Sequence, residues 1–373
     1  LHKGIDGFFA LNTGEDDDTV NGSNSTLPLI VFGGAGHDDI TTGSGTDIVF
    51  GDRGRVDYRD ANGTLVTRLG IGIAERSVLA PGIQDLTLLD VPFRQTDGTA
   101  YFAEIVVSRD TSIGGDDVIR TGTGHDIAIG GFGKDDINVG EGTNAAMGDN
   151  AKFVFDGAGQ WIEITSLATN VGDDDRIVAG NGLDITYGGF GNDDINLNNG
   201  LNTAAGDNAT ATFNSAGQIL SLTSISPADG GNDTIVTGID ADLVFGGVGD
   251  DNINVSDGTN VVAGDNATAT IDAAGQLRTV QTTHVINGGQ DTILSGMHND
   301  LIIAGTAADH VTSGAGADLI FGDNGEIDGA IDLRQLPLTP LSDAFTFRSI
   351  ATQTADLGGS DTILAGAGDD IAI

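Results

Sequence analysis

Aspartate residues recur every nine residues along much of this chain, at the ends of glycine-rich segments. One run contains Asp117, Asp126 and Asp135, each nine residues after the last. Glycine allows tight turns in which carbonyl oxygens point inward, and the aspartate adds a carboxylate at the end of the turn. Calcium accepts six to eight such hard oxygen ligands in flexible geometry. Zinc would instead need His or Cys, and neither is arranged for it in this sequence.

The aspartates at this spacing are the candidate calcium ligands. We expect aspartates 18 residues apart, such as Asp117 and Asp135, to stack on one side and share an ion. The complete predicted set is Asp38, Asp47, Asp117, Asp126, Asp135, Asp175, Asp184, Asp193, Asp233, Asp242, Asp251, Asp291, Asp300, Asp309, Asp318, Asp361 and Asp370. Asparagine takes the same position at Asn144, Asn202 and Asn260, which marks either weaker or altered sites or a hydrogen-bonded ladder of asparagines.

The composition restricts the classes of protein that fit. The 373 residues hold 15 Lys and Arg against 55 Asp and Glu, a formal charge of -40. A charge of this size requires a neutralising cation in a folded chain, and the shortage of basic residues excludes nucleic acid as a partner. No apolar run is long enough for a transmembrane helix. The sequence has no Cys, so it has no disulfide framework.

Two periods are nested in the sequence. The triplet Gly-Asp-Asn begins at Gly148, Gly206, Gly264 and Gly322, each 58 residues after the one before. Within this period the nine-residue repeat is clearest in GGAGHDDIT at 33, GGFGKDDIN at 130, GGFGNDDIN at 188 and GGVGDDNIN at 246. These segments resemble the RTX nonapeptide GGxGxDxUx, which implies a calcium-binding β-roll.

The repeats also indicate the elements that hold the aspartates. A short strand follows each turn, with its apolar side chain directed inward, so two nonapeptides form one coil. Residues 151–167, 209–225 and 267–283 alternate apolar and polar positions around a turn, which predicts β-hairpins. The expected fold is therefore all-β: a right-handed parallel β-roll solenoid of calcium-binding turns, with β-hairpin insertions every 58 residues.

The hairpins should leave the roll on one side and form a ridge. Parallel coils rise about 4.8 Å each, so hairpins on every second coil lie roughly 10 Å apart, the distance between sheets packed face to face. We therefore expect the apolar residues of successive hairpins to pack together: Phe153, Phe155, Trp161 and Ile162, then Phe213, Ile219 and Leu222, then Ile271 and Leu277.

The predicted organisation has five parts. Residues 1–54 form an irregular first RTX unit, 55–113 an inserted side module, 114–325 four regular units, 326–357 a long insertion that we expect to be a loop, and 358–373 the start of a further unit. The side module carries a group of arginines that either pair locally with the acidic roll or dock a neighbouring acidic chain: Arg55, Arg59, Arg68, Arg76, Arg94 and Arg109.

The sequence favours a structural role over catalysis. It has neither HExxH nor GxSxG, and its repeats fill most of the chain. We expect a secreted or cell-surface bacterial segment with many Ca²⁺ ions, acting in a surface, matrix or filament protein and contacting neighbouring copies or flanking repeats. The alternative is the calcium-binding appendage of a secreted protease, lipase or polysaccharide-modifying enzyme whose catalytic domain lies outside this segment. Ice binding is disfavoured, because Thr and Asn do not recur at one turn position.

Overall fold

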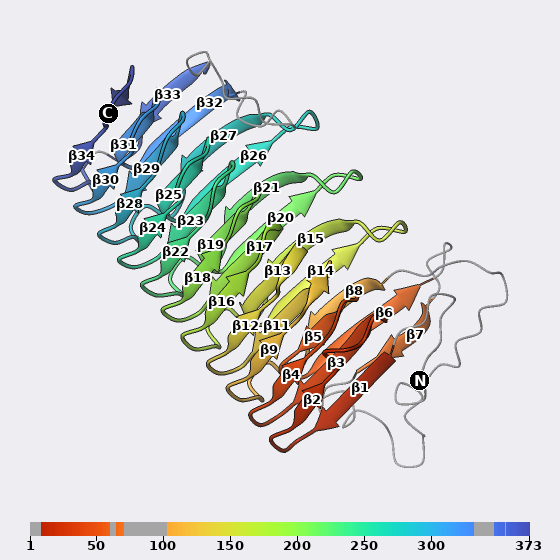
Figure 1. Ribbon diagram of the computed structural model, residues 1–373. Coiled ribbons are helices and arrows are strands. Elements are labelled where there is room, and N and C mark those ends of the chain that lie inside the picture. Colours follow the sequence, from red (N-terminus) through yellow and green to blue (C-terminus); the bar gives the residue numbers. More distant parts are fainter. Residues whose placement is uncertain (1–8, 60–64, 71–102, 332–346, 355) are drawn as a thin grey trace.

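Short parallel strands wind into a β-roll whose coils stack along one axis (Figure 1). The computed structural model describes residues 9–59, 65–70, 103–331, 347–354 and 356–373. Over these residues the chain forms strands and turns and contains no helix. None of the described elements is therefore a helix long and apolar enough to cross a membrane.

Two parallel sheets, A and B, form the walls of the roll. Sheet A contains β1 (Phe9–Gly14), β3 (Leu29–Gly34), β5 (Ile48–Phe50), β11 (Ile127–Gly131), β13 (Glu141–Asp149), β17 (Gly182–Gly189), β19 (Thr203–Asp207), β23 (Leu243–Gly247), β25 (Val261–Asp265), β29 (Leu301–Gly305), β31 (Leu319–Asp323) and β35 (Ile371–Ala372), with β10 (Thr123–Gly124) beside β13. Sheet B contains β2 (Thr19–Asn21), β4 (Asp39–Thr41), β9 (Val118–Arg120), β12 (Asp136–Asn138), β16 (Arg176–Ala179), β18 (Asp194–Leu197), β22 (Thr234–Val236), β24 (Asn252–Asn254), β28 (Thr292–Leu294), β30 (His310–Thr312) and β34 (Thr362–Leu364).

A third, antiparallel sheet, C, runs along the whole roll. Its strands, in spatial order, are β33 (Ser349–Thr352), β32 (Gly325–Ile331), β27 (Leu277–Thr282), β26 (Ala267–Ile271), β21 (Ile219–Ser224), β20 (Ala209–Phe213), β15 (Trp161–Ser166), β14 (Ala151–Phe155), β8 (Ala103–Ser108), β6 (Gly54–Arg59) and β7 (Leu65–Leu69). Three of its strand pairs, β14–β15, β20–β21 and β26–β27, are hairpins that leave the roll after sheet A.

Neighbouring hairpins join edge to edge, which corrects the expectation of face-to-face packing. Ile164 of β15 lies opposite Ala211 of β20, and Leu222 of β21 lies opposite Ala269 of β26. The physical reason is that two spacings match. Neighbouring strands of a sheet lie about 4.8 Å apart, and each coil of the roll also rises by about 4.8 Å, so a hairpin of two strands spans the same distance as the two coils after which it recurs. The strands of sheet C can therefore pair continuously along the axis of the roll.

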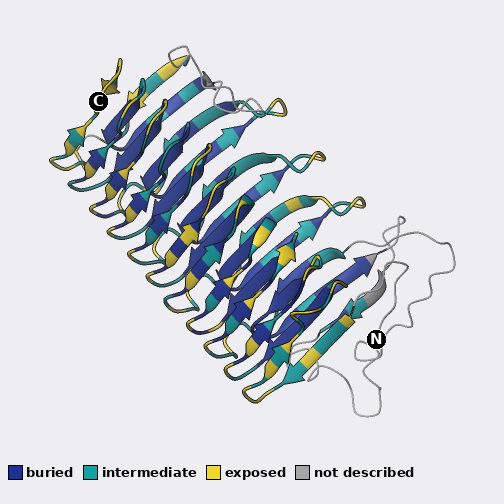
Figure 2. Cartoon of the chain, in the orientation of Figure 1, coloured by how far each residue is buried: buried dark blue, intermediate teal, exposed yellow. Residues whose placement is uncertain are grey.

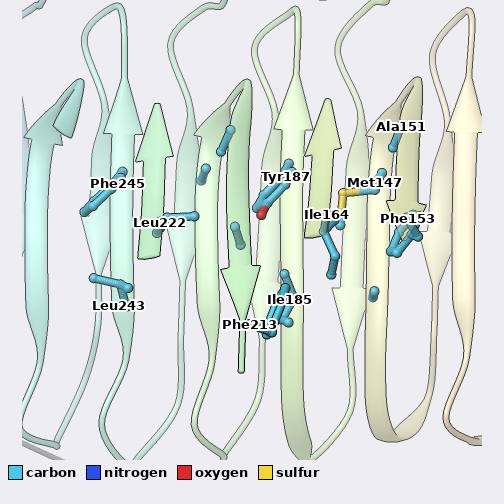
Figure 3. Packing of buried hydrophobic residues seen from close by; sticks show 14 of the residues in the cluster. Met147, Ala151, Phe153, Ile164, Ile185, Tyr187, Phe213, Leu222, Leu243 and Phe245 are labelled. Carbon is cyan, nitrogen blue, oxygen red and sulfur yellow. The ribbon is translucent and has the colours of Figure 1, made fainter. Parts of the chain in front are cut away.

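The apolar ridge residues cover sheet A. Figure 2 shows the resulting buried interior, and Figure 3 shows part of the cluster, in which Leu222 of sheet C lies between Tyr187 and Phe245 of sheet A, and Phe213 of sheet C lies beside Ile185 of sheet A. Residue Ile162, expected within this packing, is instead 44% exposed on the outer side of the sheet.

Sheet A is consequently buried on both faces. Ile127 and Ile129 pack toward sheet C, whereas Ala128 between them packs toward sheet B. A sheet covered on both sides needs continuous apolar runs, because successive side chains point to opposite faces. In sheet B buried residues, such as Ile137 in β12 or Ile195 and Leu197 in β18, alternate with more exposed neighbours.

The outward face of sheet C carries cross-strand pairs of hydroxyl side chains. The hydroxyl oxygens of Thr223 and Thr268 lie 2.7 Å apart, and those of Thr270 and Thr279 lie 2.6 Å apart. Such pairs contribute to the stability of antiparallel sheets. These threonines thus lie on strands of sheet C and not at the turn positions that were considered for ice binding.

The described ends of both long insertions also belong to sheet C. β6 pairs with β7 and β8, and β32 pairs with β33, so the expectation of a loop is wrong for the described ends of 326–357. Of the arginines in 55–113, Arg55 and Arg68 pair locally with the buried Asp57, with the shortest Arg68 contact at 2.7 Å. Arg76 and Arg94 lie outside the described residues.

Candidate metal centres

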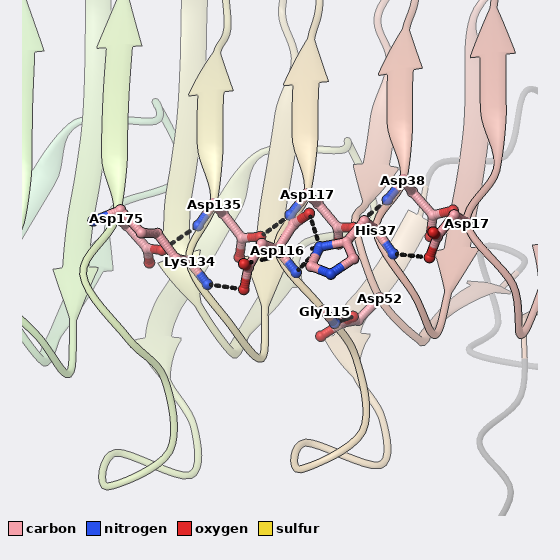
Figure 4. Close-up of polar contacts among 10 residues, drawn as sticks. All are labelled: Asp17, His37, Asp38, Asp52, Gly115, Asp116, Asp117, Lys134, Asp135 and Asp175. Atoms are coloured by element: carbon pink, nitrogen blue, oxygen red, sulfur yellow. Dashed lines mark hydrogen bonds and ion pairs between the residues drawn. The ribbon is translucent and has the colours of Figure 1, made fainter.

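A column of stacked aspartates lies at the turns that lead from sheet A into sheet B. We call it column 1; its members are Asp38, Asp117, Asp135, Asp175, Asp193, Asp233, Asp251, Asp291, Asp309 and Asp361. The backbone N–H of each residue donates to Oδ1 of the next, at 2.7 to 3.0 Å. Figure 4 shows the part of the column from Asp38 to Asp175.

The column brings together the predicted partners and adds a second kind of neighbour. The backbone N–H of Asp117 donates to Oδ1 of Asp135, 18 residues later, as the spacing predicts. The backbone N–H of Asp135 in turn donates to Oδ1 of Asp175, which lies 40 residues later, after a hairpin insertion. Each carboxylate therefore stands between two neighbouring coils. Asp361, in the last described coil, is only half-buried.

The second carboxylate oxygen of these aspartates is buried and has no hydrogen-bond partner. This holds for Oδ2 of Asp38, Asp117, Asp135, Asp175, Asp193, Asp233, Asp251, Asp291 and Asp309. A buried carboxylate oxygen without a hydrogen-bond donor is costly unless a cation compensates it. The regular repetition of this arrangement points to a ligand common to all of the turns.

Glycines at the start of each turn leave room beside these oxygens. A methyl group added to Gly130 would collide with Oδ2 of Asp135 and with the carbonyl oxygen of Gly148 on the next coil. The same pair of collisions occurs at Gly188, with Oδ2 of Asp193 and the carbonyl of Gly206. A carboxylate and a carbonyl from adjacent coils thus converge on each glycine.

This donor set fits calcium. Among the described residues no three acidic, histidine or cysteine side chains converge on one point, as a zinc site would require. Column 1 instead offers one carboxylate oxygen together with backbone carbonyls, the mixture of hard oxygen ligands that calcium takes. When bound, calcium supplies the positive charge that the buried carboxylates lack.

Burial makes the ionised carboxylates unfavourable without a cation. It raises the pKa of Asp38 to about 6 and those of Asp117 and Asp309 to about 7. For Asp175 and Asp193, burial first and neighbouring carboxylates second raise the pKa well above its usual range. At neutral pH the ionised carboxylates of column 1 are therefore unfavourable in the folded chain unless cations neutralise them.

A second column lies at the opposite turns, which lead from sheet B back to sheet A. We call it column 2; its members are Asp47, Asp126, Asn144, Asp184, Asn202, Asp242, Asn260, Asp300, Asp318 and Asp370. The same N–H to Oδ1 ladder continues through it, at 2.8 to 3.3 Å. Burial raises the pKa of Asp184 to about 7 and that of Asp300 to about 8, whereas Asp370 is half-buried.

The asparagines of column 2 satisfy their own turns. Nδ2 of Asn202 donates to the carbonyl of Asn198 at 2.9 Å, and Nδ2 of Asn260 donates to the carbonyl of Gly258 at 3.2 Å. Asparagine and aspartate alternate from 126 to 300, so the ladder joins unlike residues and is not a continuous stack of asparagines. An amide N–H thus bonds a turn carbonyl at these positions.

Sequence reasoning missed a further set of aspartates at the bases of the hairpins. These are the buried Asp52, Asp149, Asp207 and Asp265 and the half-buried Asp323, and the last four are the second residues of the Gly-Asp-Asn triplets. Asp265 accepts from the N–H of Gly289, where the hairpin returns, at 3.0 Å, and from the N–H of Thr306 on the next coil at 2.5 Å. The carboxylate therefore joins the outgoing chain, the returning chain and the next coil.

The third residue of the triplet ties the hairpin back to the preceding coil. Nδ2 of Asn208 donates to the carbonyls of Thr169 at 3.0 Å and Asp229 at 3.1 Å. The strict 58-residue spacing of the triplet was the signal for these residues. The Asp and Asn of the triplet form hydrogen bonds at the base of the hairpin, and these bonds fix the hairpin to both neighbouring coils.

Comparison with known proteins agrees with this geometry. The family model for the RTX calcium-binding nonapeptide repeat (4 copies) matches residues 30–55, 112–145, 227–262, 294–326 and 356–372. No curated protein and no solved structure gives a match. The coil between these segments, which includes Asp175 and Asp193, continues column 1 without a break. We conclude that this chain contains RTX calcium-binding nonapeptide repeats, and that these repeats bind calcium ions.

Proposed function

We propose that this chain is a calcium-dependent structural or adhesive segment of an extracellular bacterial surface, matrix or filament protein, and that it has no catalytic activity of its own. The observation that carries the proposal is the continuity of the sheets. Over the described residues, sheet A has 13 strands and sheets B and C have 11 each, and all three follow the same axis. The result is an elongated body in which each coil is bonded to the next on three sides.

The energetics of such a stack suit a load-bearing element. Each unit contacts only its neighbours, so its stability is the sum of unit and interface contributions. Calcium adds to every interface in column 1, because successive carboxylates belong to adjacent coils. If each site has a dissociation constant ten-fold below the ambient calcium concentration, it contributes about 1.4 kcal/mol.

The arrangement of the buried acids favours a structural role. In the described coils, the predicted ligands are stacked in two columns, and in column 1 their second oxygens lie beside turn glycines and backbone carbonyls. The pocket described below is lined by apolar residues together with Thr203 and Gln218, without an acid or a base. General acid or base catalysis would need a titratable group beside a substrate site.

An extracellular location is part of the proposal. Extracellular calcium modules often bind at 10⁻⁴ to 10⁻³ M, concentrations that occur outside the cell. A chain with a charge of -40 would remain extended before export and would fold on meeting calcium. The same property favours the alternative, in which the segment is a folding appendage of a secreted protease, lipase or polysaccharide-modifying enzyme.

A shortened protein can separate the two roles in the producing bacterium. Deletion of residues 150–207 removes one whole period and joins Asp149 to Asn208, so that the triplet and the coil register are kept. A structural or adhesive segment predicts weaker attachment or matrix retention, with secreted hydrolase activities unchanged. Loss of a secreted hydrolase activity, with attachment unchanged, would support the enzyme appendage and contradict the proposal.

A further inference from the structure

An apolar pocket of about 480 Å³ opens beneath the tips of two neighbouring hairpins, β20–β21 and β26–β27. Its walls include Leu183 and Leu201, which precede column 2 residues, together with Phe213, Ile219 and Ile271 of sheet C. The turns of both hairpins contribute glycine and alanine to its lining, and the first turn also contributes Gln218. A volume of this size lies within the range of small-molecule sites.

The pocket has no charged residue in its lining, although the chain as a whole carries a charge of -40. A charged ligand would lose its hydration without gaining an ion pair there, which is unfavourable. Apolar walls and a buried aromatic ring, that of Phe213, favour a neutral ligand with a flat apolar surface.

The internal repeat of the chain shows what such a gap can hold. One period of 58 residues before Ile219 stands Trp161, and one period before Ile271 stands Phe213. Trp161 packs against Phe213 with a ring-centroid distance of 5.7 Å and an angle of 55° between the rings. The gap between the first and second hairpins therefore holds an indole ring. The equivalent gap between the second and third hairpins has only the smaller Ile219, and the pocket lies there.

We infer that this pocket is a binding site for a small, uncharged aromatic compound of about the size of indole. The ligand takes the place that the side chain of Trp161 occupies in the preceding repeat and packs between Phe213, Ile219 and Ile271. This site is independent of the calcium columns and goes beyond the proposed structural role.

Titration of the full calcium-loaded chain with indole tests the inference. Isothermal calorimetry, together with the methyl NMR signals of Ile219 and Ile271, should show one saturable site per chain. Ile219→Trp fills the pocket with the residue that its repeat equivalent already carries, so we expect indole affinity to fall at least ten-fold. Leu294→Trp adds the same ring at a position that is 42% exposed on sheet B and should leave binding unchanged.

A second variant predicts a gain of binding. Trp161→Ile should open the equivalent gap between the first two hairpins and raise the stoichiometry to two. The new site should be the weaker one, because His125 and Thr143 stand where the original pocket has Leu183 and Leu201. Circular dichroism should confirm that each variant is folded. The absence of saturable indole binding to the wild type, unchanged affinity in folded Ile219→Trp, or a stoichiometry of one in folded Trp161→Ile would overturn the inference.

Discussion

The backbone N–H of Asp175 donates a hydrogen bond of 2.7 Å to Oδ1 of Asp193, which lies one coil further along the roll. The other oxygen of Asp193 is buried without a hydrogen-bond partner. One side chain therefore combines two roles: Oδ1 holds the coils together, and Oδ2 is available to a cation. Substitutions that remove one role at a time can separate them.

Asp193→Asn should lower calcium binding while keeping the hydrogen bond to Asp175. An amide oxygen still accepts the N–H, but the buried negative charge is gone, so the calcium-free protein should become more stable than the wild type. Asp193→Ala removes the acceptor as well and should cost about 1–3 kcal/mol through the unpaired N–H of Asp175. Calorimetric calcium stoichiometry and urea unfolding measure the two effects. Asp194→Asn, at a side chain that is 60% exposed, is the control, and an unchanged stoichiometry in Asp193→Asn would contradict the assignment.

Gly130→Ala should block a calcium site without changing any charge. The added methyl group would collide with Oδ2 of Asp135 and the carbonyl of Gly148, the two oxygens that converge there. We expect the loss of at least one calcium ion per chain and a lower melting temperature in calcium. Gly157→Ala is a matched control at a hairpin tip, where an added methyl group meets no atom within 4 Å. Equal calcium binding by both variants would show that the glycine does not border a site.

Removal of calcium should unfold the roll at neutral pH. Without the ions, the carboxylates of column 1 face one another across adjacent coils, and their repulsion adds to the burial that already raises their pKa. Circular dichroism before and after chelation with EGTA, followed by readdition of calcium, measures the change. A β-sheet spectrum that persists in EGTA at pH 7.5 would show that calcium is not required for the fold.

Acid should partly replace calcium. Burial raises the pKa of Asp117 to about 7 and that of Asp300 to about 8, from an ordinary value of 3.8. Between pH 4 and pH 8 the folded chain therefore holds protons that the unfolded chain has lost, and the free energy of unfolding falls as the pH rises. Calcium-free protein, prepared by ion exchange because EGTA binds calcium poorly in acid, should be more folded at pH 4.5 than at pH 8. Greater stability at pH 8 would reverse the predicted sign.

Much of this architecture could be predicted from the sequence, because the repeat fixes the stacking. A nine-residue period places Asp117 and Asp135 one coil apart, and the backbone N–H of Asp117 donates a hydrogen bond to Oδ1 of Asp135. The 40-residue contact between Asp135 and Asp175 also follows, since 40 is the remainder of a 58-residue period after one 18-residue coil.

The way in which the hairpins pack could not be predicted from their own pattern. Alternation in β14 shows that one face is apolar, but it does not identify the surface that this face covers. The available signal was in sheet A: three consecutive apolar residues at 127–129 require cover on both faces, whereas Ile119 stands alone between partly exposed neighbours. The contacts of Asp265 could not be predicted either, because its carboxylate accepts hydrogen bonds from backbone N–H groups, whose positions no side-chain pattern reveals.

Asn202→Asp should add a calcium site to column 2. In the native chain, Nδ2 of Asn202 donates to the carbonyl of Asn198 at 2.9 Å, and its Oδ1 accepts from the N–H of Asp184 at 3.3 Å. Aspartate keeps the second bond but places a carboxylate oxygen beside the carbonyl in place of an N–H. The two oxygens repel each other without a cation, so the calcium-free variant should be less stable than the wild type, and the calcium-loaded variant should bind at least one more ion. Asn196→Asp adds the same charge at an exposed position of β18 and should leave the stoichiometry unchanged. If Asn202→Asp is folded and binds no more calcium than Asn196→Asp, the alternating asparagines do not determine which turns of column 2 take up the ion.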